Sequence, residues 1–119
     1  MDWKLKQSNL QIQKIELNRI NTSVEGGELF LKVQSFTVVN LIRDLDPSIG
    51  LILKNNIDSL WNDFYKANRN WKPKDTYGGA SSVEKKRQWT IFKAKSLQRL
   101  HLDICEAVQN AIDVGELLE

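Results

Sequence analysis

The sequence predicts an all-α protein, a single-domain antiparallel bundle of about four helices that ends in a long C-terminal helix. Two observations predict this fold. Apolar residues recur at spacings of three and four along most of the chain, and the few glycines and prolines fall where helices would begin or end. The length of 119 residues, with 41% hydrophobic and 27% charged residues, fits one ordinary domain spanning residues 1–119 with a real core.

The first segment, Leu10–Ile20, is the most ambiguous. Its apolar residues alternate like those of a strand in places, whereas Leu10, Leu17 and Ile20 share one face of a helix. We expect a helix, because the strand that would pair with it overlaps a segment that favours helix. The alternative is an N-terminal β-hairpin packed on a three-helix bundle, with its turn at Gly26-Gly27.

The segment Glu28–Leu45 is predicted to form the next helix. We expect five apolar side chains to be buried here: Leu29, Phe30, Val33, Phe36 and Leu41. Val38, Val39 and Ile42 make the helix apolar on more than one side. Such a helix is either central in the bundle or exposed at an interface.

A third helix begins after Asp46, which is a good N-cap and precedes Pro47 at the first helical position. The following apolar residues at helical spacing define one face: Ile49, Leu53, Ile57, Leu60, Phe64, Ala67 and Trp71. Lys72-Pro73 ends the helix, because the residue before a proline disfavours helical geometry.

A flexible basic loop about 72–82, which contains Gly78-Gly79, separates this helix from the last one. Ser81 and Glu84 have the spacing of a capping box. The second half of the final helix then shows a seam of apolar residues at alternating spacings: Leu97, Leu100, Ile104, Ala107, Ala111, Val114 and Leu118. A neighbouring helix must cover that seam.

Charge is distributed unevenly along the chain. Between Lys66 and Arg99 there are ten basic and two acidic residues, a net charge of +8, and the rest of the chain carries −6. Such a segment attracts polyanions, and a phosphate backbone is the first partner to consider. Eight residues are predicted to bind RNA or single-stranded DNA on one exposed wall, without sequence preference: Lys72, Lys74, Lys85, Lys86, Arg87, Lys93, Lys95 and Arg99.

The seam, extended backwards at 100° per residue, passes through Lys86 and Lys93. Charged side chains would not be buried along a packed helix, so we expect the N-terminal turns of the last helix to stand clear of the bundle.

Aromatic residues near this segment are candidates for stacking on bases. Trp71 and Trp89 lie on apolar stripes, which favours packing in the core, as it does for Trp61. Tyr77 lies in the Gly-Gly loop, off any stripe, and is the preferred stacking candidate, with Trp89 second. Tyr77 could equally anchor the loop.

No residue set supports an enzyme, a metal site or a cofactor. His101 has no carboxylate partner fixed in sequence, and it follows Arg99 too closely for the Arg-to-His spacing of helical HEPN ribonucleases. Cys105 is the single cysteine and fits a packing role. Asp44 and Asp46 fit a helix end and a cap better than a metal site. A phosphate-binding loop motif is absent from the sequence.

The segment at the N-terminus is broken by charges, unlike a signal peptide, and no window approaches the roughly 20 apolar residues that span a bilayer. We therefore expect a cytoplasmic protein with no membrane partner.

Length, helical patterning, one basic segment and the lack of a catalytic set together make the chain resemble the small subunit of CRISPR effector complexes. The resemblance covers the whole chain in architecture and charge. It implies a helical bundle present in repeated copies along a guide-RNA assembly, where it steadies a strand through backbone contacts. The +8 segment would then face the strand, and other faces would contact neighbouring protein subunits. Small basic proteins that chaperone RNA for a reverse transcriptase share these gross features.

A rival interpretation needs no nucleic acid. Residues 100–119 contain five acidic residues and no Lys or Arg. The acidic end of one copy could meet the basic segment of the next, or the basic face could meet an acidic protein surface, as in an adaptor or a self-assembling subunit.

Overall fold

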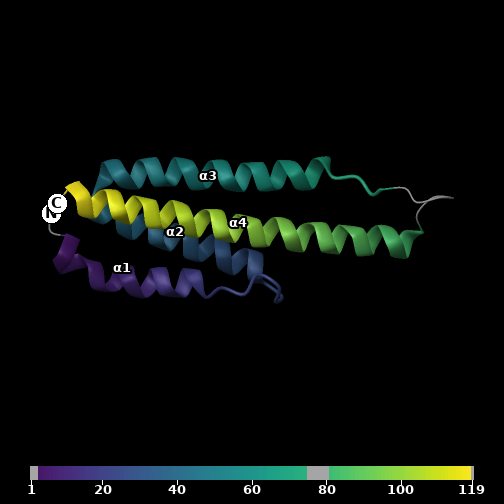
Figure 1. Ribbon diagram of the computed structural model, residues 1–119, viewed down its shortest axis with the longest axis horizontal. Coiled ribbons are helices and arrows are strands. Elements are labelled where there is room, and N and C mark those ends of the chain that lie inside the picture. The colour runs from purple at the N-terminus through teal and green to yellow at the C-terminus, as the bar shows by residue number, and fades with distance from the viewer. Residues whose placement is uncertain (1–2, 75–80, 119) are drawn as a thin grey trace.

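The computed structural model describes residues 3–74 and 81–118, except for the side chains of residues 3–6, 117 and 118. Within these ranges it contains four helices and no strand (Figure 1): α1 (Trp3–Asn18), α2 (Gly27–Leu45), α3 (Pro47–Asn70) and α4 (Ser82–Leu118). The predicted all-α bundle with a long last helix is confirmed. The alternative with an N-terminal β-hairpin is wrong, because Gly26, at a φ of 79°, is the N-cap of α2.

Helix α4 is the axis of the molecule. It packs against α1, α2 and α3, whereas α1 and α3 have no contact with each other in the described ranges. At 37 residues α4 is far longer than α1, α2 and α3, which have 16, 19 and 24 residues. As Figure 1 shows, α1 lies beside the C-terminal half of α4, α2 reaches past the middle of α4 as far as Lys93, and α3 extends furthest along the N-terminal half. The expected separation of the N-terminal turns of α4 from the bundle is only partial: residues 82–96 have no fully buried side chain, but Trp89 packs on Trp71 and Lys93 pairs with Glu28 of α2.

The core strip of α4 follows the predicted seam only at first. Leu97, Leu100 and Ile104 are buried, and the strip then continues through Val108 and Ile112. The predicted seam positions after Ile104 are displaced by one residue: Ala107 and Ala111 are half-buried, and Val114 is exposed. A straight helix drifts away from a strict heptad, and the larger Val and Ile side chains bury more apolar area than alanine does.

The predicted buried face of α2 is wrong. Leu29, Phe30 and Val33 are 63%, 58% and 59% exposed, and Phe36 and Leu41 are half-buried. The helix instead buries six other residues that face α1, α3 and α4: Leu31, Ser35, Val38, Val39, Ile42 and Leu45. Because α2 is apolar on two sides, its sequence pattern does not decide which side faces the core.

The start of α3 is capped as predicted. The Asp46 carboxylate accepts hydrogen bonds from the backbone N–H groups of Ser48 and Ile49, at 3.0 and 3.1 Å. Most of the predicted stripe is buried or half-buried, and Trp61 joins the core. Ala67 is exposed, because it lines an open groove between α3 and α4.

Helix α1 begins earlier than predicted, at Trp3, and buries Leu10 and Leu17 as its sequence suggests. Its end is tied to α4: the His101 imidazole Nε2 donates to the Leu17 carbonyl oxygen at 2.7 Å. The same carbonyl also accepts from the Ile20 backbone N–H at 3.4 Å, so the end of α1 is held by a local hydrogen bond and by one from α4. The histidine is thus a half-buried structural residue, as expected.

Gly50 fixes how closely α3 approaches α2. A Cβ atom at this position would lie 2.5 Å from the Arg43 Cα atom, which is too close for any rotation of a side chain to relieve. Gly50→Ala should therefore lower the free energy of unfolding by about 1–2 kcal/mol, measured by urea denaturation, although alanine has the better helix propensity. Asn55→Ala, at an exposed position of the same helix, serves as the control and should not destabilise the protein. Equal stability of Gly50→Ala and the wild type would contradict this packing.

Candidate nucleic-acid interface

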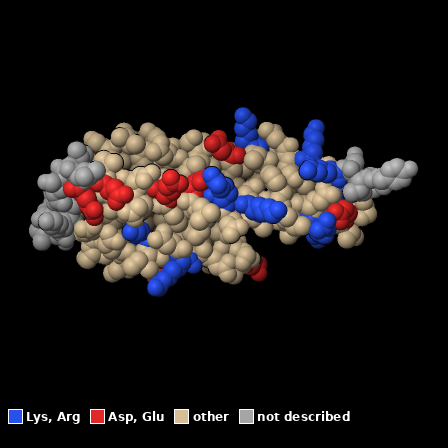
Figure 2. Space-filling view, in the orientation of Figure 1, with Lys and Arg blue, Asp and Glu red and all other residues tan. Residues whose placement is uncertain are grey.

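The basic residues of the +8 segment lie in one half of a molecule that is 63 Å long. They come from the last turns of α3, from residues 71–74 and from the N-terminal half of α4. We call this set the basic end: Lys66, Arg69, Lys72, Lys74, Lys85, Lys86, Arg87, Lys93, Lys95 and Arg99. On the face of α4 seen in Figure 2, blue side chains lie over the N-terminal half and red ones over the C-terminal half.

The predicted nucleic-acid-binding side chains of α4 surround the helix instead of sharing one wall. At 100° per residue, Lys95 and Arg99 lie on the side away from the core, and Lys86 and Lys93 lie on the side of the core strip. Arg87 projects in a third direction. Because three consecutive basic residues, 85–87, are spread around a helix by its period, the positive field encloses this half of α4.

Three of the eight predicted binding residues contact carboxylates of the chain itself. Arg87 pairs with Glu84 at 2.8 Å, Arg99 with Asp103 at 3.2 Å and Lys93 with Glu28 at 3.6 Å. The other five have no carboxylate within 4.0 Å among the described residues, and all five are exposed: Lys72, Lys74, Lys85, Lys86 and Lys95. These five are the cations most available to an external anion.

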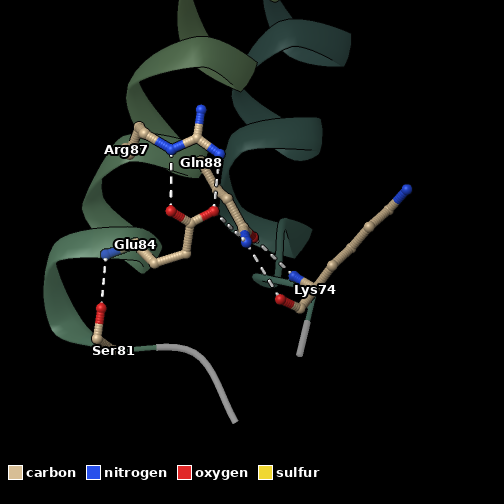
Figure 3. Close-up of polar contacts among 5 residues, drawn as sticks. All are labelled: Lys74, Ser81, Glu84, Arg87 and Gln88. Atoms are coloured by element: carbon tan, nitrogen blue, oxygen red, sulfur yellow. Dashed lines mark hydrogen bonds and ion pairs between the residues drawn. The ribbon is translucent and has the colours of Figure 1, made fainter. Parts of the chain in front are cut away.

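The first turn of α4 is held by local contacts, which Figure 3 shows. The Ser81 hydroxyl accepts from the Glu84 backbone N–H at 3.1 Å, so Ser81 caps the helix as predicted. The Glu84 carboxylate accepts from Arg87 through both oxygens and also from Gln88. The Arg87 hydrogen bonds, followed by that of Gln88, lower the pKa of Glu84 to about 2. Glu84 is therefore charged at neutral pH and offsets the charge of Arg87.

Gln88 joins the segment after α3 to α4. Its side-chain oxygen accepts from the Lys74 backbone N–H at 2.9 Å, and its nitrogen donates to the Lys74 carbonyl oxygen at 3.2 Å (Figure 3). This contact holds Lys74 beside the cations of α4. Sequence reasoning missed Gln88, because nothing in a glutamine 14 residues away signals such a contact.

Aromatic rings hold the same junction. Trp71, Trp89 and Phe92 form a cluster with ring centroids 5.2 to 6.1 Å apart. All three are half-buried, which supports the packing role that their stripes predict. Tyr77 and the Gly-Gly part of the predicted loop lie outside the described residues.

The described residues contain no cluster of three or more His, Cys, Asp or Glu side chains that could hold a metal ion. Burial raises the pKa of the Cys105 thiol, which packs against the core and is thus a poor nucleophile. No helix within the described residues is long and apolar enough to cross a membrane.

Comparisons with protein-family models, with curated proteins and with solved structures give no match to this chain.

The Gln88 contact can be tested through amide exchange. Gln88→Leu removes both hydrogen bonds to the Lys74 backbone, so the Lys74 amide should exchange roughly fivefold faster, as expected for the loss of about 1 kcal/mol. Hydrogen exchange followed by NMR measures this residue directly. Gln98→Leu, at an exposed position of the same helix, should leave the exchange of Lys74 as it is. Unchanged exchange in Gln88→Leu would show that Gln88 does not hold the segment.

Proposed function

We propose that this protein binds the phosphate backbone of RNA or single-stranded DNA through its basic end, without catalysis and without sequence preference. The observation that supports this proposal is the accumulation, in one half of a long molecule whose remainder is acidic, of exposed cations that have no carboxylate partner among the described residues. A field with this polarity attracts a polyanion to one end and repels it from the other.

The five unpaired cations support backbone contacts more than base recognition. Lysine is a flexible point charge that suits phosphate oxygens, whereas sequence readout uses planar groups such as arginine, asparagine and glutamine. The two arginines of the predicted set, Arg87 and Arg99, are already engaged with carboxylates.

The proposal includes a place in a larger cytoplasmic ribonucleoprotein assembly, in line with the resemblance to small subunits of CRISPR effector complexes. The basic end would face the strand. Leu29, Phe30 and Val33 on the outer side of α2 form an exposed apolar surface that suits contact with a neighbouring protein.

That apolar surface also favours a second candidate function, a protein-binding adaptor whose basic end meets an acidic protein. The two candidates differ in the polyanion that they prefer. An adaptor would bind an acidic polypeptide such as polyglutamate in preference to RNA of equal charge, whereas a strand-binding subunit would prefer RNA or DNA.

Salt dependence tests the leading proposal. If the five unpaired cations contact phosphates, log K against log salt should have a slope of roughly −3.5 on single strands, measured by fluorescence anisotropy with a labelled oligonucleotide. Oligonucleotides of different sequence should bind alike. Affinity that does not change with salt, or no binding at low salt, would contradict the proposal.

Charge reversal identifies the surface. The triple change Lys85→Glu, Lys86→Glu and Arg87→Glu removes two of the five proposed phosphate contacts and places three new negative charges beside the strand, so it should weaken binding at least roughly 50-fold at physiological salt. The matched control is Lys14→Glu, Arg19→Glu and Lys54→Glu, which alters charge equally outside the basic end. Both triple variants break one ion pair within a helix, Arg87 with Glu84 or Lys54 with Asp58. Equal losses in the two variants would mean that net charge alone drives binding, against the proposed surface.

A further inference from the structure

The side of α4 that faces away from the core changes sign near its middle. Lys95, Arg99, Asp103 and Glu106 lie within about 80° of one another around the helix axis, opposite the core strip. We call these four residues the outer face. The first two are basic and the last two are acidic, so the sign changes around residue 101 (Figure 2).

A face of this kind is complementary to itself. If a second copy is turned by a two-fold axis that crosses α4 near residue 101, the two α4 helices run antiparallel. Arg99, which pairs with Asp103 of its own chain at 3.2 Å, then also meets Asp103 of the second copy, and Lys95 meets Glu106. Each contact occurs twice, as in any isologous interface. A parallel arrangement of the same faces would instead place like charges together.

Exposed ion pairs alone contribute too little for stable association, about 0.2–1 kcal/mol each. The structure supplies apolar surface beside them. An open groove of about 590 Å³ runs between α3 and the C-terminal half of α4, with Asp103 and Glu106 at its edge. It is lined mainly by apolar side chains, among them Ile52 and Leu60. Ile52 is 62% exposed.

The two-fold arrangement places the N-terminal half of the second α4 along this groove. That half carries cations that match the acidic edge. A second copy therefore meets both the charge pattern and the apolar groove with one orientation.

We propose that two copies of this chain pair through the outer faces of their α4 helices, antiparallel and two-fold symmetric. The pairing is a property beyond strand binding. In the pair, Lys95 and Arg99 face the second copy. Lys72, Lys74, Lys85, Lys86 and Arg87 remain at the two far ends for other partners.

The test uses two charge variants, each of which should fail to dimerise alone but should form a dimer with the other. Lys95→Glu with Arg99→Glu makes the outer face wholly acidic, and Asp103→Lys with Glu106→Lys makes it wholly basic. Sedimentation velocity at low salt should give the wild type twice the chain mass of 13.7 kDa. Each variant alone should sediment as a monomer, and an equimolar mixture should restore the dimer. High salt should dissociate the mixture, since exposed pairs are screened. Restoration by mixing also shows that both variants fold.

A matched control separates this pairing from nucleic-acid binding. Lys86→Glu with Arg87→Glu changes charge equally but lies off the outer face, so it should keep the dimer while weakening RNA binding. A monomeric wild type at all accessible concentrations, dimers that persist in both variants alone, a mixture that stays monomeric, or species larger than a dimer would each overturn the proposal.

Discussion

The packing of three helices on one strip of α4 determines the rest of the structure. Leu97, Leu100, Ile104, Val108 and Ile112 occupy that strip, and burying them removes a continuous apolar surface from water. The strip occupies only part of a 37-residue helix, because α1 and α2 are too short to reach further. Before Leu97, α4 has no fully buried side chain, and there the chain concentrates its positive charge. The core strip and many of the candidate binding residues therefore lie along different parts of the same helix.

Local signals in the sequence predicted the helices well where a side chain decides the backbone. Asp46 and Ser81 cap their helices as their positions suggest, because a side-chain oxygen next to free N–H groups acts within a few residues. The face of each helix that is buried was harder to predict. Leu29 and Leu31 are equally apolar, and only the position of the neighbouring helices decides that Leu31 is buried. The same holds for Ala107 and Val108, which lie side by side in the sequence.

The sequence predicted where the candidate site lies, but not which contacts its residues make. Counting charges between Lys66 and Arg99 located the basic end, since helices that follow one another in an antiparallel bundle return to the same end. Counting could not show which cations are neutralised. The partner of Lys93 is Glu28, 65 positions earlier in the chain, and the backbone of Lys74 is held by Gln88. Such contacts follow from the packed arrangement of helices, and no short pattern encodes them.

The aromatic cluster at the junction of α3 and α4 gives the protein an optical reporter of its own. The indole rings of Trp71 and Trp89 lie 5.2 Å apart, close enough for their electronic transitions to couple and to produce a near-ultraviolet circular dichroism band. Trp61 lies in the core, packed edge-on against Phe64 at 5.8 Å. Separation of the N-terminal turns of α4 from the end of α3 would thus alter the coupled band while the environment of Trp61 stays the same, so spectroscopy can distinguish local opening from loss of the whole fold.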